Sequence, residues 1–158
     1  NMINNIRKEK DIFDKIIELP GLRIFQPFYK KYKEILLYLF FGGLTMIVSI
    51  VSYAICNLVF GIDVLVANII SWLLAVMFSF YTNRIWVFQA STNSISGFLK
   101  QMVSFYSGRV ATLIIEEIIL FIFITYLQYN SMVVKIIAQV VVVILNYVIS
   151  KLWVFRKL

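Results

Sequence analysis

Four long apolar stretches constrain the fold of this 158-residue chain more than any other feature of its sequence. Each is long enough for the roughly 20 residues that a helix needs to cross a bilayer. They cover residues 35–60, 64–83, 101–127 and 132–151. The last contains a β-branched run, but a helix is still expected, because lipid offers the backbone no hydrogen-bond partners. The sequence therefore predicts an all-α integral membrane protein with four transmembrane helices.

The composition supports a membrane protein and argues against an enzyme. Hydrophobic residues make up 61 % of the chain, above the roughly 45–50 % of soluble domains, and the mean hydropathy is +0.88. The chain has one cysteine and no histidine, which removes a disulfide framework and the commonest general base and metal ligand. Glycine-rich phosphate loops, metalloprotease motifs and nucleophile elbows are absent from the sequence. We therefore expect no catalytic residue, no metal and no cofactor.

The connections and the cations predict the topology. The turns at 61–64 and 128–132 are short, so spans one and two form a hairpin, and so do spans three and four. The link at 89–100 is longer and polar. Most of the 15 Lys and Arg residues lie in the N-terminal segment, at the link and at the C-terminus. By the positive-inside rule, both termini are cytoplasmic, and the net charge of +7 reflects topology and anionic membrane lipids, with no nucleic acid as partner.

Residues 1–33 form the one long polar segment. Ile12, Phe13, Ile16 and Ile17 recur at helical spacing among charged residues, as in an amphipathic helix at a membrane surface. Pro20-Gly21 is expected to end this helix. No short apolar core with a cleavage site follows the basic residues, so a cleavable signal peptide is not predicted. We divide the chain into a cytoplasmic amphipathic segment, 1–33, and a four-helix transmembrane domain, 34–158.

A motif of a cation followed by Trp-Val-Phe occurs twice, 67 positions apart. The two copies are "NRIWVF" (83–88) and "SKLWVF" (150–155). The same offset relates polar positions of spans two and four, namely Asn68 to Lys135, Trp72 to Gln139 and Ser79 to Asn146. It predicts a duplicated hairpin, related by an axis along the membrane normal. Spans one and three match less well, because "FFGG" (40–43) and "FYSG" (105–108) need a shift of two. An interfacial aromatic anchor is the alternative explanation of the motif.

Ionisable residues inside the third span mark a candidate site. Arg109 and Glu116 share a helical face with Thr112 between them, whereas Glu117 points about 100° away. Placing Arg109 against lipid would cost at least about 3 kcal/mol. Either Arg109 is neutralised inside the protein by a carboxylate or by carbonyl groups, or its planar guanidinium binds an anionic group such as phosphate.

Three groups of residues are therefore candidates for the site. Cations spaced across the membrane suit a ligand with a phosphate head and a lipid tail. The candidate phosphate-binding cations are Arg109, Arg84, Lys135 and Lys151. Polar residues that could line the cavity or bind a sugar are Asn83, Asn146, Glu116, Gln139 and Asn68. The residues expected to pack the motif and flank an inner entrance are Trp86, Val87, Phe88, Phe105, Trp153 and Phe155.

With these motifs, the chain resembles the GtrA family of small membrane proteins. The resemblance rests on "NRIWVFQ", "YSGRVATL" and "NYVISKLWVF" and covers about residues 34–155. It implies translocation of a polyprenyl-phosphate-linked monosaccharide across the bacterial cytoplasmic membrane, for glycosylation of a cell-wall polysaccharide such as teichoic acid. A polyprenyl-phosphate glycosyltransferase would be the partner. Positions that matter in the family map onto Asn83, Val87, Phe88, Phe105, Arg109, Lys135 and Asn146. Ser150-Lys151 departs from the Asn-Arg pattern, so the role of Asn83 does not transfer to Ser150.

Two alternatives belong to other functional classes. The chain could recruit or stabilise a glycosyltransferase without moving a lipid, with its intramembrane charges paired to that partner. It could instead export a small cation or couple to protons through Glu116 or Glu117, although Arg109 on the same face would repel a cation. Four short spans enclose little volume, and the Gly42-Gly43 pair permits close helix contact, so a homo-oligomer is plausible.

Overall fold

The chain folds into helices, as predicted. The computed structural model describes residues 11–92 and 94–156, without the side chains at positions 64, 65, 131, 132 and 135. Within these residues there is no strand. The α-helices are α1 (Ile12–Ile17), α2 (Gln26–Ala54), α3 (Val64–Thr82), α4 (Ile95–Leu120) and α5 (Ser131–Ile149). A short 3₁₀ helix, η1 (Arg23–Phe25), precedes α2.

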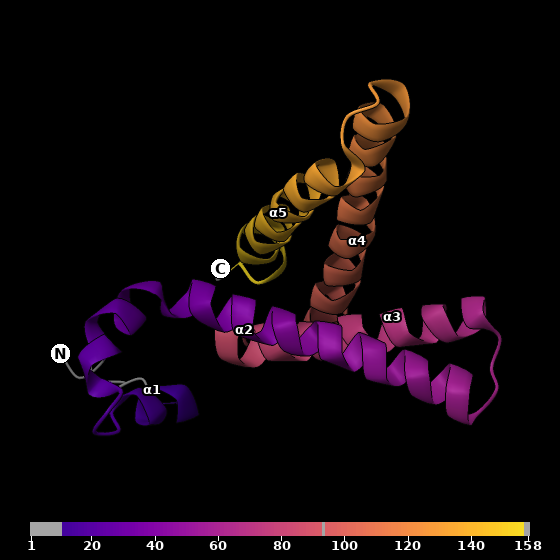
Figure 1. Cartoon of the computed structure of the whole chain (residues 1–158). Coiled ribbons are helices and arrows are strands. Elements are labelled where there is room, and N and C mark those ends of the chain that lie inside the picture. The colour runs from indigo at the N-terminus through magenta and orange to yellow at the C-terminus, as the bar shows by residue number, and fades with distance from the viewer. Residues whose placement is uncertain (1–10, 93, 157–158) are drawn as a thin grey trace.

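The long helices pair into two antiparallel hairpins, α2 with α3 and α4 with α5. Figure 1 shows that the hairpins meet where α4 begins and α5 ends, and that they diverge from there. We call this meeting point the motif end, since residues 83–88 and 150–155 lie there. The two predicted hairpins are therefore present, but they form an open wedge rather than a closed bundle.

Among the described residues, three helical stretches are long and apolar enough to cross a membrane: Arg23–Val59, Val66–Val87 and Ile136–Val154. Helix α4 is also long, but Arg109, Glu116 and Glu117 reduce its apolar character. It packs against α5 within the second hairpin. A fourth span formed by α4 thus stays a prediction, supported by its pairing with a helix that is apolar enough to span.

Each of the four long helices ends in a wider, π-helical turn. These turns are η2 (Ile55–Val59), η3 (Asn83–Val87), η4 (Phe121–Tyr126) and η5 (Ser150–Val154). In the two motif copies, the Phe88 N–H donates to the Asn83 carbonyl at 2.8 Å, and the Phe155 N–H donates to the Ser150 carbonyl at 2.9 Å. The repeated sequence therefore adopts the same backbone turn twice, although α2 and α4, which lack the motif, end in the same kind of turn.

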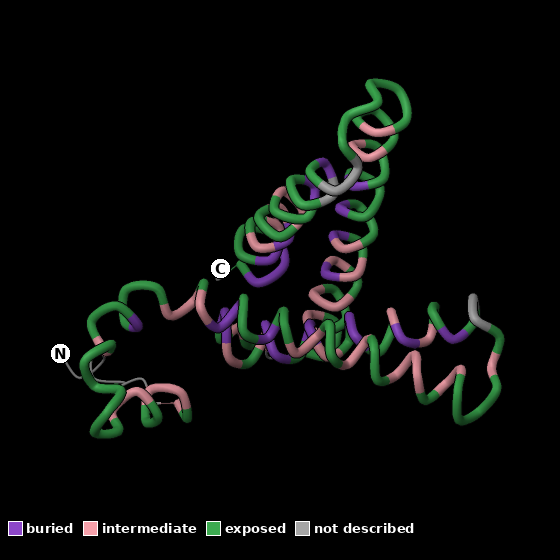
Figure 2. Tube along the Cα trace, viewed as in Figure 1, coloured by how far each residue is buried: buried purple, intermediate pink, exposed green. Residues whose placement is uncertain are grey.

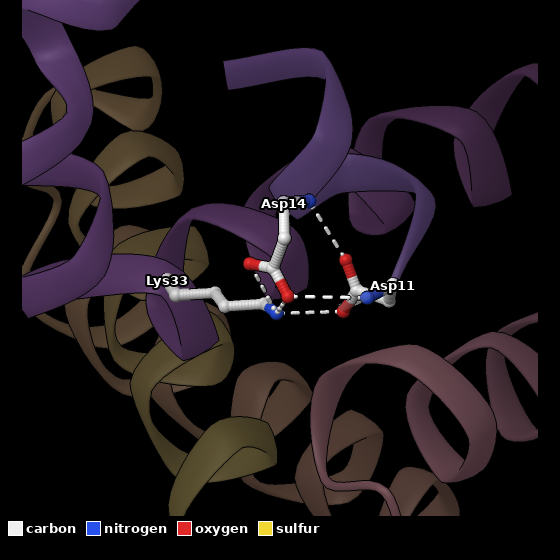
Figure 3. Close-up of polar contacts among 3 residues, drawn as sticks. All are labelled: Asp11, Asp14 and Lys33. Carbon is white, nitrogen blue, oxygen red and sulfur yellow. Dashed lines mark hydrogen bonds and ion pairs between the residues drawn. The ribbon is translucent and has the colours of Figure 1, made fainter. Parts of the chain in front are cut away.

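The N-terminal segment folds back onto α2. Asp11 caps α1 and forms a reciprocal capping box with Asp14, an arrangement that satisfies the free N–H groups of the first turn. The Lys33 ammonium of α2 reaches both carboxylates, Asp11 at 2.6 Å and Asp14 at 2.7 Å (Figure 3). Phe13 packs edge-to-face on Phe41 of α2, with ring centroids 5.6 Å apart. The predicted short helix is present, and the chain turns after it near Pro20; its location at a membrane surface stays a prediction.

The hydrophobic core lies at the motif end. Its centre is the Phe88–Phe155 pair, which stacks at 5.3 Å between ring centroids with planes 22° apart. The buried cluster around this pair comprises Leu37, Tyr38, Phe41, Val76, Phe80, Val87, Phe105 and Val154. Figure 2 shows buried residues on the facing sides of the helices, whereas the outer faces are exposed. Exposed apolar faces are the surface that a membrane protein presents to lipid.

Contacts across the core repeat at the offset of 67. Phe80 packs on Phe155 at 5.8 Å, and Tyr147, which corresponds to Phe80, packs on Phe88 at 6.0 Å. Phe80 also packs on Phe105 at 5.6 Å, and Tyr147 packs on Tyr38 at 5.3 Å. These contacts pair Tyr38 with Phe105 without any shift. The alignment of "FFGG" (40–43) with "FYSG" (105–108), which needs a shift of two, is therefore wrong. The repeat extends through spans one and three at the offset of 67.

Candidate functional site

Arg109 of α4 lies half-buried where the two hairpins meet. Its Nη2 donates to the Ser79 hydroxyl of α3 at 3.2 Å. The guanidinium also lies over the Phe105 ring, 4.8 Å from the centroid, a cation–π contact that helps to stabilise a partly desolvated cation. Among the described residues, no carboxylate lies within ion-pair distance of Arg109. The guanidinium therefore keeps donors that another group can use.

Gly108 allows α4 to approach α5 at this point. A Cβ on Gly108 would lie 2.9 Å from Cγ2 of Ile149, closer than side chains tolerate without a shift. Gly108 faces α5, and the next residue, Arg109, points to another side of α4 and contacts α3. A small residue thus positions the charged one.

Asn83 completes a polar cluster with Ser79 and Arg109. Its amide nitrogen donates to the Ser79 carbonyl at 2.7 Å and to the Ser79 hydroxyl at 3.1 Å. The side chain is only 2 % exposed, and its Oδ1 has no hydrogen-bond partner among the described residues. A buried acceptor without a partner costs about 1–3 kcal/mol. The cluster therefore joins a cation and a buried acceptor through Ser79, a set that suits an anion carrying hydroxyl groups.

The other polar residues of α4 contact α5 instead. Buried Thr112 donates to Oδ1 of Asn146 at 2.9 Å. Gln139 donates to the Glu116 carboxylate, and Glu116 is 6 % exposed. Arg109 and Glu116 share one face of α4 but contact different helices. Arg109 contacts α3 near the motif end, and Glu116 contacts α5 further along. The carboxylate partner that Arg109 could have had is engaged elsewhere, and Glu117 is exposed.

The cations of the motif connect the two hairpins. Arg84 donates from Nε to the Gln101 side-chain oxygen at 3.0 Å and from Nη2 to the Thr92 hydroxyl at 3.1 Å. Lys151 forms an ion pair with Glu34 at 2.8 Å. At the offset of 67, Lys151 corresponds to Arg84 and Gln101 to Glu34, so the two contacts are equivalent. Both cations were predicted to bind phosphate, and here both have protein partners.

The aromatic residues of the motif divide into core and surface. Val87, Phe88, Phe105 and Phe155 are buried, as expected of packing residues. The two tryptophans differ: Trp86 stacks on Phe41 at 5.3 Å, whereas Trp153 is 78 % exposed. Only Trp153 presents its ring as a free surface.

The remaining predicted residues lie away from this cluster. Asn68 is exposed near the start of α3, and it contributes nothing to the Arg109 cluster. Lys135 lies early in α5, and its side chain is outside the described part of the structure. Ser79, Gln101 and Glu34 were not predicted as site residues. Ser79 had one signal, because the repeat aligns it with Asn146.

Comparison with known proteins places this architecture in a family. The profile of the GtrA/DPMS transmembrane domain matches residues 37–155. The chain belongs to this family of membrane proteins.

Among its relatives is the cell wall teichoic acid glycosylation protein GtcA of Listeria monocytogenes, 33 % identical over 124 residues, 78 % of this chain and 85 % of the relative. GtcA of Listeria innocua is 35 % identical over 124 residues, with the same coverage. The uncharacterized membrane protein YwcD of Bacillus subtilis is 35 % identical over 121 residues, 77 % of this chain and 95 % of the relative.

Proposed function

We propose that this protein translocates a polyprenyl-phosphate-linked monosaccharide across the bacterial cytoplasmic membrane, for glycosylation of teichoic acid or a similar cell-wall polymer. Relatives named for teichoic acid glycosylation support the process. The observation that carries the transport step is Arg109. It is a half-buried cation between the hairpins, with no carboxylate partner among the described residues.

A phosphate group is the ligand that best fits this cation. The guanidinium fork makes two parallel hydrogen bonds to phosphate oxygens. Asn83 Oδ1, which lacks a partner among the described residues, would accept a hydrogen bond from a sugar hydroxyl group. A bound sugar phosphate would therefore satisfy both groups of the cluster at once.

The wedge between the hairpins suits a lipid ligand. The hairpins diverge from the motif end (Figure 1), and their exposed apolar side chains include Leu113 and Ile114 of α4. The polyprenyl tail would stay in the bilayer while the head passes between the hairpins. A complete aqueous channel would then be unnecessary. The protein binds and moves its ligand in this account, and a partner glycosyltransferase carries out the bond chemistry.

The motif end faces the cytoplasm in this proposal. Cations concentrate there and in the N-terminal segment, which the positive-inside rule assigns to the cytoplasmic side. Both termini then lie in the cytoplasm. Lys135, near the opposite end of α5, would be the outermost phosphate contact.

Transport by the purified protein tests the proposal. The full chain is reconstituted in liposomes with a fluorescent short-chain polyprenyl-phosphate sugar, and the fraction accessible to an external reductant is followed over time. Faster exchange between leaflets than in protein-free liposomes is the expected result. If folded protein gives no exchange, the transport proposal fails and the recruitment of a glycosyltransferase becomes the better account.

A further inference from the structure

A cavity of about 890 Å³ lies beside Phe155 at the motif end, and Arg109 is not among the residues that line it. Its wall is formed by residues 89–92, the first turns of α4 and residues 152–156. Lys100 and Arg156 supply its cations, and neither Asp nor Glu occurs among the described residues that line it. The cavity is thus positively charged, and it is large enough for a small polar molecule.

The lining also carries groups that suit a sugar. Ser91, Gln101 and Ser104 offer hydroxyl and amide groups, which hydrogen-bond to sugar hydroxyls as donors and as acceptors. The exposed ring of Trp153 forms part of the wall. An aromatic face with polar neighbours can pack on a sugar ring while leaving its hydroxyls bonded. Cations, hydroxyls and an aromatic ring together select a sugar phosphate.

A second cavity, of about 560 Å³, shows how the repeat has diverged. It is lined by Glu34, Phe88, Lys151, Leu152, Phe155 and Arg156. Glu34 occupies the position that Gln101 holds in the first cavity, at the offset of 67. Its carboxylate already neutralises Lys151 at 2.8 Å. Arg156 lines both cavities, but the acid in the second cavity makes it less favourable for an anion than the first, which has two cations and no acid among its described lining residues.

We propose that the larger cavity is a loading site for the sugar-phosphate head group, with Lys100 and Arg156 binding the phosphate and Trp153 packing on the sugar. This inference rests on the proposed function and gives the ligand a place to bind before it reaches Arg109. Ser104 in the cavity wall precedes Arg109 by five positions on α4, a rise of about 7.5 Å. Five positions also turn the helix by about 140°, so the head group would move that far along α4 and partly around it to reach the guanidinium.

Binding of citronellyl phosphate, a short isoprenoid phosphate, tests the site without measuring transport. The full chain in nanodiscs of neutral lipid is titrated with citronellyl phosphate, citronellol and inorganic phosphate. Lys100→Gln/Arg156→Gln should raise the Kd for citronellyl phosphate about tenfold or more. The matched control, Lys30→Gln/Lys31→Gln, removes the same charge from exposed positions of α2 outside the cavity lining and should change it less than twofold. Because Trp153 lies in the cavity wall, a change of tryptophan fluorescence on titration with a citronellyl-phosphate-linked sugar should disappear in Trp153→Phe, which keeps Trp72 and Trp86.

The outcomes separate this site from the transport proposal. Unchanged citronellyl phosphate affinity in the Lys100→Gln/Arg156→Gln protein, with its elution profile and thermal unfolding unchanged, would overturn the loading site even if the wild type transports. Selective loss of binding would support the site even if the wild type fails to transport in liposomes. Inorganic phosphate binding as tightly as citronellyl phosphate would identify a free-phosphate site and overturn the assignment of the cavity to a lipid head group. Citronellol binding as tightly as citronellyl phosphate would show that the cavity does not recognise phosphate, and it would overturn the loading site.

Discussion

Lys151 and Glu34 form an ion pair, 2.8 Å apart, that joins the last turn of the second hairpin to the first helix of the first hairpin. The equivalent contact, Arg84 to Gln101 at 3.0 Å, joins the first hairpin to the second. Each hairpin thus holds the other through the same position of the repeat. The offset places Gly42 where Arg109 stands in the second hairpin. The repeat therefore builds one scaffold from two similar halves but places an arginine at this position in the second half alone.

Gln101→Glu should strengthen one of these contacts and weaken ligand binding. Arg84 would gain an ionic partner, and such partly exposed pairs contribute about 0.2–1 kcal/mol. The same carboxylate would enter the larger cavity and repel a phosphate. We expect a slightly higher thermal unfolding midpoint in detergent and a several-fold higher Kd for citronellyl phosphate. Lys151→Gln is the control that removes the other pair, and it should lower the midpoint. A lower midpoint for Gln101→Glu would contradict the equivalence of the two contacts.

Gly108→Ala should destabilise the protein, whereas Gly42→Ala should not. The new Cβ at position 108 would lie 2.9 Å from Ile149 Cγ2, and overpacking of this kind costs about 1–3 kcal/mol. No heavy atom lies within 4 Å of a Cβ built at Gly42, so alanine there gains helix propensity of up to about 1 kcal/mol. Thermal unfolding of the two variants measures the difference. Equal stability of both would show that α4 and α5 are not closely packed at Gly108.

Gln128→Gly should stabilise the turn between η4 and α5. Gln128 has a φ of 57°, a left-handed conformation that costs a residue with a Cβ about 1–2 kcal/mol. Glycine removes this strain, although its greater freedom in the unfolded chain offsets part of the gain. Gln128→Ala loses the same side chain but keeps the Cβ, so it should show no gain. An increase in the unfolding midpoint for alanine equal to that for glycine would exclude backbone strain as the cause.

Docking of α1 should persist to low pH. Burial opposes ionisation of Asp11, but the hydrogen bond from Lys33, the backbone N–H groups of Asp14 and Phe13 and the charge of Lys33 together outweigh it and hold the pKa of Asp11 below its usual value. The contribution of this contact is therefore complete above the usual aspartate pKa of about 3.9 and is lost as the pH falls through the lowered value. A nitroxide label on Ile16→Cys, in a Cys56→Ser background, should stay equally restricted from pH 8 to pH 5. Lys33→Gln should release it at pH 7, and equal mobility with and without Lys33 would show that the ion pair does not hold α1.

The sequence predicts the helices well and the partners of charged residues poorly. Hydropathy placed the span ends at 60, 83, 127 and 151, close to the turns that end at Val59, Val87, Tyr126 and Val154. The start of α2 at Gln26 was missed, because hydropathy reports where lipid begins and not where a helix begins. Arg109 was identified because a charge in an apolar span is costly. Its partner Ser79 gives no such signal, and the sequence separation of Glu34 and Lys151 hides their contact.

Transport by an Arg109→Gln protein tests the central claim most directly. Glutamine keeps a hydrogen-bond donor for Ser79 but removes the charge, so the fold should be retained while phosphate binding is lost. The rate of exchange of a short-chain polyprenyl-phosphate sugar between liposome leaflets is measured for this variant and for the wild type, at matched amounts of folded protein. The account predicts a decrease of about tenfold or more, the effect of losing a charged phosphate contact. Exchange at the wild-type rate would contradict Arg109 as the phosphate site.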